Sequence, residues 1–220
     1  MKPFEYLLCQ MELEGIRRVS GDLITPSSPK VDDLPFVLIA RTSDGQNLIC
    51  LDATLPNKIR SQLPKDDLQA CKTGKAIKVF EGLGMHVKAS HFITYIFPEG
   101  MSADPELVNC YSKDDPKIVD FGFHGLADQV YAIEKERTIL SACVSSRQNS
   151  SCAEAWVFTH PDHRLKGLAQ KVVTAWANNT KAEGLIPFYS HNIENINSAL
   201  LASRLNLIWV FEEIVIEKAS

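Results

Sequence analysis

The sequence predicts an α+β protein in which a mixed, mostly antiparallel sheet is flanked by helices and preceded by an amino-terminal α+β domain. Short apolar runs separated by polar turns recur along the chain, as in sheets built from hairpins. In the second half, a long amphipathic segment at residues 167–183 separates two such runs, which is typical of a helical crossover. Residues 98–116 are rich in Gly, Pro, Ser and Asp and divide the chain. We therefore expect domains at residues 1–104 and 105–220.

The composition is that of an ordinary globular protein. Of the 220 residues, 45% are hydrophobic and 23% are charged, and the formal net charge is −4. This balance gives no support for nucleic-acid binding, which normally shows a concentrated basic face. No apolar run approaches the roughly 20 residues that cross a bilayer, and the first residues lack the apolar segment of a secretory signal. The six cysteines form no Cys-x-x-Cys pair, so we expect reduced thiols and a cytoplasmic protein.

The amino-terminal half contains strand and helix signals but no catalytic pattern. Residues 1–34 combine a short amphipathic start with a turn-rich run. Residues 36–39 and 47–51 are apolar runs separated by Asp44-Gly45, a good hairpin signal because the turn needs positive φ. Two helical segments are expected at residues 56–63 and 65–71, and a strand is expected at residues 89–97. His86, His91 and His124 have no carboxylate or cysteine at ligand spacing, so we expect no metal site.

The carboxy-terminal half gives the clearest succession of elements. Residues 130–133 and 139–144 flank a charged turn and predict an antiparallel strand pair. Residues 153–159 are apolar enough for a central strand. A helix is expected at Gly167–Glu183, with one stripe of side chains facing the sheet and Gly184 closing its end. Another strand follows at residues 186–190. That stripe comprises Leu168, Val172, Ala175, Trp176 and Asn179, with Trp176 in the core.

The turn before this helix carries the first functional signal. The first turn of a helix leaves backbone N–H groups without internal partners and carries partial positive charge. Gly167 and Ala169 leave room for an anion there, and Arg164 and Lys166 add full charge, which together suit a diphosphate. The glycine patterns of the P-loop and of dinucleotide-binding folds are both absent. The alternative is a surface turn whose cations only solvate the helix start.

A second signal follows the strand at residues 186–190. Asn195 is a good helix N-cap, and Leu201 and Leu205 lie four residues apart on one face. Asn206 suits the left-handed end of a helix. On these residues alone, the segment is a short capped helix.

Together, the two segments resemble the signatures of the GNAT superfamily of N-acyltransferases. Residues Arg164 to Ala169 match its pyrophosphate pattern, Gln/Arg-x-x-Gly-x-Gly/Ala. The second pattern is Asn-x-x-Ser/Ala, a helix, then Leu-Gly-Phe. This chain matches it at Asn195, Ser198, Ala202 and Leu205, and departs from it at Asn206 and Leu207. The resemblance covers roughly residues 105–220 and leaves the front half unassigned.

The resemblance implies a GNAT-type sheet, an acyl-CoA co-substrate, most simply acetyl-CoA, and an amine acceptor that attacks the thioester directly. It implies no metal, and a homodimer is left open. By resemblance, the coenzyme would be held by one set of residues from the strand, the turn and the last helix. These residues are Val157, Phe158 and Thr159 for the pantetheine arm, Arg164, Leu165, Lys166, Gly167, Leu168 and Ala169 for the pyrophosphate, and Asn195 with Ser198 near the thioester.

The catalytic acid and base are less defined by the sequence. An ammonium acceptor must lose a proton before attack, and Glu154 and His191 are the candidate bases. Many relatives place an acidic tyrosine where this chain has Ala202, so Tyr189 is the candidate substitute. The missing tyrosine also favours a second hypothesis, a non-catalytic acyl-CoA-binding module. A cysteine hydrolase lacks the Cys–His–carboxylate arrangement that it would need.

Overall fold

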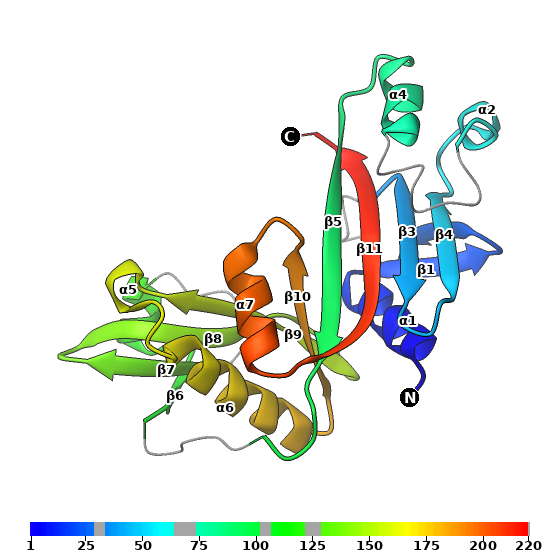
Figure 1. Ribbon diagram of the computed structural model, residues 1–220. Coiled ribbons are helices and arrows are strands. Elements are labelled where there is room, and N and C mark those ends of the chain that lie inside the picture. The colour runs from blue at the N-terminus through cyan, green and yellow to red at the C-terminus, as the bar shows by residue number, and fades with distance from the viewer. Residues whose placement is uncertain (29–33, 64–73, 102–106, 122–128, 220) are drawn as a thin grey trace. The chain divides into compact units, whose positions relative to one another are not determined.

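The computed structural model describes residues 1–28, 34–63, 74–101, 107–121 and 129–219, and they divide into two compact units (Figure 1). Unit 1 comprises residues 1–94, 192–194 and 209–220, and unit 2 comprises residues 95–191 and 195–208. The expected boundary between residues 104 and 105 falls outside the described residues, and the division into two domains there stays a prediction. The expected α+β class, with a mostly antiparallel sheet flanked by helices, is confirmed.

Unit 1 contains a sheet with the strand order β1-β2-β4-β3-β11-β5. Its elements are α1 (Pro3–Leu13), β1 (Ile16–Ser20), β2 (Leu23–Pro26), β3 (Val37–Thr42), β4 (Asn47–Asp52), α2 (Asn57–Arg60), α4 (Lys75–Glu81), β5 (Val87–Ile96) and β11 (Ile208–Lys218). β2 and β4 pair in parallel, whereas β3 pairs antiparallel with both β4 and β11. His91 Nε2 and Glu212 Oε2 lie 2.9 Å apart and join β5 to β11.

The amino-terminal predictions hold for β3, β4 and β5, with Gly45 at φ 87° in the turn between β3 and β4. Two features of the expected pattern differ. The first 34 residues form α1, β1 and β2, because Leu7 and Met11 bury one face of a helix that the sequence shows only as an amphipathic start. Only Asn57–Arg60 of the expected helix at residues 56–63 is α-helical. The helix expected at residues 65–71 lies outside the described residues.

Unit 2 contains a sheet with the strand order β10-β9-β8-β7-β6. Its elements are β6 (Asn109–Ser112), α5 (Pro116–Phe121), β7 (Gln129–Lys135), β8 (Thr138–Gln148), β9 (Cys152–Thr159), the 3₁₀ turn η1 (Pro161–His163), α6 (Leu168–Ala182), β10 (Ile186–Asn192) and α7 (Ile196–Arg204). The β7–β8 turn places Glu136 and Arg137 at φ 51° and 66°, which is the positive-φ pair that a two-residue hairpin requires.

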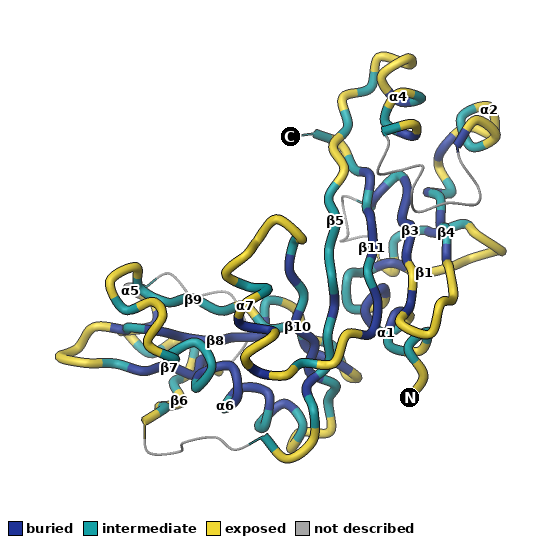
Figure 2. The backbone as a smooth tube through the Cα atoms, in the orientation of Figure 1, coloured by how far each residue is buried: buried dark blue, intermediate teal, exposed yellow. Residues whose placement is uncertain are grey.

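Helices cover both faces of the unit 2 sheet. Figure 2 shows the middle of β8 buried. Because side chains alternate across a strand, both faces of β8 must be covered. On one face, α6 and α7 pack against Tyr131, Cys143 and Ala153, and on the other, α5 packs against Val130 and Ala142.

The buried stripe of α6 overlaps the predicted stripe only in part. Val172 and Trp176 are buried as expected, and Trp176 Nε1 donates to Ser145 Oγ at 3.0 Å. Ala175 and Asn179 are only half-buried, whereas Val173, Ala177 and Thr180 are buried. The stripe is rotated because α7 covers part of the same core, with Leu201, Ala202 and Leu205 packed against it.

Candidate functional site

The site begins where β9 and β10 separate. These strands run parallel, and their register covers only three residue pairs, from Ile186 opposite Cys152 to Phe188 opposite Glu154. After these pairs, Val157, Phe158 and Thr159 continue β9 with no recorded partner in β10, while β8 stays paired with β9 as far as Thr159. One edge of β9 is therefore open over its last residues.

Hydrogen bonding along β8 shows which backbone groups face this open edge. The N–H group of His160 donates to the carbonyl of Leu140 at 2.8 Å, and Ser141 Oγ donates to the carbonyl of Phe158 at 2.8 Å. Since backbone polar groups alternate along a strand, those of Phe158 face β8. The N–H and C=O groups of Val157 and Thr159 therefore face the open edge.

The turn after β9 directs the first turn of α6 toward the open edge of β9. Leu165 and Gly167 adopt left-handed conformations at φ 61° and 77°, and Gly167 is the N-cap of α6. The N–H group of Lys171 donates to the carbonyl of Gly167 at 3.4 Å, so the N–H groups of Leu168, Ala169 and Gln170 precede the intrahelical ladder. These donors lie at the positive end of the helix dipole.

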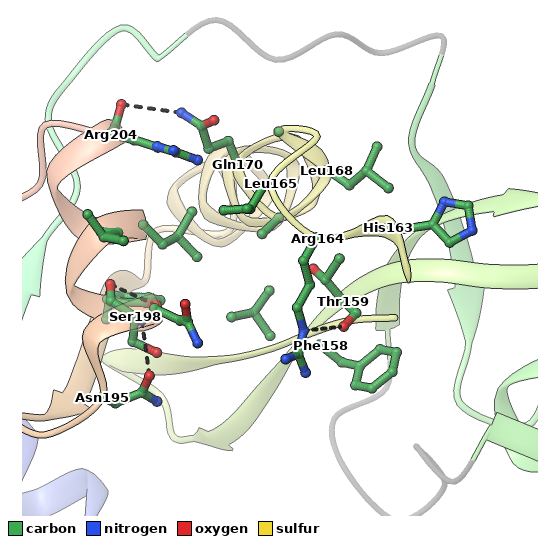
Figure 3. Close-up of a pocket in the computed structure, with 17 residues that line it drawn as sticks. Phe158, Thr159, His163, Arg164, Leu165, Leu168, Gln170, Asn195, Ser198 and Arg204 are labelled. Atoms are coloured by element: carbon green, nitrogen blue, oxygen red, sulfur yellow. Dashed lines mark hydrogen bonds between the residues drawn. The ribbon is translucent and has the colours of Figure 1, made fainter. Parts of the chain in front are cut away.

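A cavity of about 320 Å³ joins the open strand edge to this helix start (Figure 3). Most of the residues expected to hold a coenzyme line it. They are Val157, Phe158, Thr159, Arg164, Leu165, Gly167, Leu168, Ala169, Asn195 and Ser198, and the candidate acid Tyr189 lines it as well. Lys166, Glu154 and His191 lie outside the cavity lining.

The two cations of the turn have different surroundings. Arg164 Nε donates to the carbonyl of Thr159 at 3.3 Å, which holds its side chain along the cavity wall (Figure 3). Lys166 Nζ donates to the carbonyl of Asp162 at 2.9 Å. Arg164 is thus the cation of this turn that a ligand in the cavity would meet directly.

The start of α7 forms the facing wall. Asn195 caps the helix, and its Oδ1 accepts from the N–H group of Ser198 at 3.1 Å. The Tyr189 hydroxyl donates to the carbonyl of Ser198 at 3.5 Å, and burial raises the pKa of Tyr189 to about 12. Tyr189 is therefore a neutral O–H donor throughout the physiological pH range. Ala202 is buried.

A family model described as GNAT acetyltransferase matches residues 121–212, the part of the chain that contains the splayed strands, the turn and both helices around the cavity.

Residues 121–212 are a GNAT acetyltransferase domain.

Several solved structures are similar to this chain at low sequence identity. The X-ray structure of a Drosophila protein is 10% identical and covers 99% of this chain and 88% of its own, with a TM-score of 0.50. A GCN5-related N-acetyltransferase-like protein from Streptococcus suis is 17% identical over 66% of this chain and 68% of its own, with a TM-score of 0.46. A GNAT-family acetyltransferase from Colwellia psychrerythraea is 11% identical over 84% and 81%, with a TM-score of 0.48. A comparison with curated proteins found no match.

The two candidate bases of the GNAT domain lie outside the cavity. Glu154 shares the face of Phe158, opposite α6, and its Oε2 is 3.5 Å from Arg147 Nη1 and 3.4 Å from Ser146 Oγ. The buried ring of His191 stacks on Tyr95 with centroids 5.6 Å apart and meets Tyr189 edge-on at 6.3 Å.

Several residues that line the cavity of the GNAT domain were not expected from the sequence. They are His163, Gln170, Asn197, Leu200, Leu201 and Arg204. Asn197, Leu201 and Arg204 are spaced four and three residues apart, and this helical spacing would have placed the three of them on one face of α7. His163 adjoins Arg164, and nothing in its own position distinguishes it.

Within residues 1–28, 34–63, 74–101, 107–121 and 129–219, no group of three or more His, Cys, Asp or Glu side chains could hold a metal ion. No helix in the described parts of the chain combines the length and hydropathy needed to span a membrane.

Proposed function

We propose that the GNAT domain is an acyl-CoA-dependent N-acetyltransferase, which transfers acetyl from acetyl-CoA to an amine by direct attack. The observation that carries the proposal is the cavity that connects the open edge of β9 to the first turn of α6. An extended arm with amide groups can pair with the open edge while a diphosphate meets the helix N–H groups. Acetyl-CoA presents these two chemistries in that order.

The cavity lining suggests a role for each binding element. The backbone groups of Val157 and Thr159 would pair with the pantetheine amides, with Asn195 and Ser198 near the thioester. The N–H groups from Leu168 to Gln170 would hold the diphosphate, supported by Arg164 and, at longer range, by Lys166. Gly167 keeps the turn in a left-handed conformation that costs most other residues about 1–2 kcal/mol.

In the proposed reaction, the amine nitrogen attacks the thioester carbonyl carbon. A C–N bond forms and the carbonyl oxygen becomes an oxyanion, and the attacking nitrogen then loses its extra proton to water. The oxyanion reforms the C=O bond, the C–S bond breaks, and CoA leaves as a thiolate. Holding the two reactants together can contribute about 7–11 kcal/mol in well-oriented systems. Since the N–H group of Phe158 faces β8, Thr159 or Val157 is the better oxyanion donor, and loss of one such donor costs about 3–4 kcal/mol in other enzymes.

Tyr189 is the proposed acid that protonates the departing thiolate. It lines the cavity, it is neutral at assay pH because burial raises its pKa to about 12, and it reaches toward the start of α7. It would thus do from β10 what relatives do with a tyrosine at the position of Ala202. Glu154 or His191, through water, would take the proton that the ammonium acceptor must lose before attack.

One residue favours a second candidate function, a non-catalytic acyl-CoA-binding module. This residue is Ala202, which cannot donate a proton. Acetyl-CoA would be mixed with a panel of primary amines, and free thiol would be measured together with calorimetric binding of acetyl-CoA. Amine-dependent thiol release supports the enzyme, tight binding without release supports the module, and absence of binding refutes both.

We also propose a cytoplasmic location. Among the described residues, Cys50, Cys110 and Cys143 are free thiols, which suits a reducing compartment. Labelling of the native protein from its own cells with a thiol reagent tests this proposal, because oxidised pairs would contradict it.

A further inference from the structure

The cavity of the GNAT domain contains a second arginine besides Arg164. Arg164 lines it from the turn after β9, and Arg204 lines it from α7. No residue of the lining is an Asp or a Glu. The cations come from two separate elements, so they form two positive positions within one cavity.

Arg204 occupies the second position. It is the last residue of α7, and its carbonyl accepts from Gln170 Nε2 at 3.4 Å, which ties it to the first turn of α6. Figure 3 shows its guanidinium directed toward Gln170, whereas Arg164 reaches toward Thr159. Within the residues that the structure describes, no carboxylate forms an ion pair with Arg204. Its charge is therefore exposed and available to a ligand.

From this arrangement we infer that Arg204 binds the ribose 3′-phosphate of CoA and makes the site selective for CoA over dephospho-CoA. The inference rests on the proposed function, in which the helix N–H groups and Arg164 already serve the diphosphate. The 3′-phosphate is the remaining anionic group of CoA, and it carries nearly two charges at neutral pH. A guanidinium fork binds phosphate oxygens in pairs, which suits this group better than a single donor would.

A basic residue in the last turn of a helix also complements the helix dipole. Loss of Arg204 could therefore lower the stability of α7 whether or not it touches a ligand. Selectivity between two ligands that differ only in the 3′-phosphate is independent of that contribution, because a change in stability affects both ligands equally.

The experiment measures calorimetric Kd values for CoA and dephospho-CoA with wild-type protein, Arg204→Gln, Arg204→Lys and the control Arg137→Gln. Arg137 is an exposed cation on the β7–β8 turn of the same unit and does not line the cavity. The wild type should prefer CoA by about tenfold, as expected for one charge-assisted contact that is open to solvent. Arg204→Gln should remove most of this preference, Arg204→Lys should keep part of it, and Arg137→Gln should keep all of it.

Each contrary result has a distinct meaning. Equal wild-type affinity for the two ligands overturns the inference without any variant, and leaves the proposed function intact. Equal losses for both ligands in Arg204→Gln also overturn it, because Arg204 would then contact the shared diphosphate or only stabilise the fold. If neither ligand binds the wild type, the proposed function fails together with the inference.

Discussion

Replacement of Arg164 by Gln separates a direct ligand contact from general positive charge in the turn. Arg164 lines the cavity, with Nε 3.3 Å from the carbonyl of Thr159. Lys166, two residues away, donates to the carbonyl of Asp162 and lies outside the cavity lining. Both side chains are exposed, so they have similar solvent screening and make a matched pair.

The expected magnitudes follow from these contacts. A hydrogen bond to a charged group contributes about 1.5–3 kcal/mol, and the exposure of Arg164 favours the lower end of this range. Since about 1.4 kcal/mol corresponds to a factor of ten, Arg164→Gln should weaken acetyl-CoA binding at least about tenfold, and Arg164→Glu should weaken it further. Lys166→Gln should weaken it by at most about fivefold, because a screened pair at longer range contributes about 0.2–1 kcal/mol.

The assay is calorimetric titration of acetyl-CoA into each variant at 50 mM and 300 mM salt, with thermal unfolding to confirm the fold. Arg137→Gln, far along the chain on the β7–β8 turn, serves as the charge control and should bind as the wild type does. Equal losses for Arg164→Gln and Lys166→Gln would refute the assignment of a direct contact to Arg164 alone. Unchanged affinity in Arg164→Glu would refute the diphosphate site itself.

Three further predictions concern the same site. Gly167→Ala and Gly184→Ala should each lower the free energy of unfolding by about 1–2 kcal/mol, because both glycines have φ near 80° and an added Cβ would find at most ordinary contact. Only Gly167→Ala should also weaken acetyl-CoA binding, and equal affinities of the two variants would remove Gly167 from the site. Tyr189→Phe should lower kcat roughly 100-fold with little change in acetyl-CoA affinity, and an unchanged kcat would assign the proton to another donor. Since burial raises the pKa of Tyr189 to about 12, the wild-type pH–rate profile should show no descending limb from this acid below about pH 10. Asn195→Ala should lose about 1 kcal/mol of stability because it removes the N-cap, whereas Asn195→Ser should keep the cap and its stability. Both variants should raise KM for acetyl-CoA, and KM values equal to that of the wild type would limit Asn195 to capping.

Sequence reasoning was most successful where one or two residues decide the backbone conformation. Asn206 adopts a left-handed conformation as expected, and Asn195 caps α7. Gly184 closes α6 at φ 80°. These outcomes depend on steric preferences and hydrogen bonds within about four residues, so they can be inferred from the local sequence.

The orientation of neighbouring cations could not be inferred in the same way. Arg164 and Lys166 have equivalent positions in the sequence pattern, but only Arg164 lines the cavity. The difference arises because the left-handed Leu165 between them redirects the chain, and nothing in the residue type of a leucine signals such a conformation. The contact of Glu154 with Arg147 likewise depends on the register between β8 and β9.

By itself, the sequence determined the succession of strands and helices in the second half of the chain, the left-handed ends at Gly184 and Asn206, and the cap of α7. Only the tertiary structure decided that β9 and β10 part after three residue pairs, that Tyr189 and Arg204 reach the resulting cavity, and that β11 pairs with β3. The physical reason is the distance along the chain over which each interaction acts. Backbone conformation depends on neighbours a few residues away, whereas strand register and side-chain direction depend on packing between segments far apart in the chain.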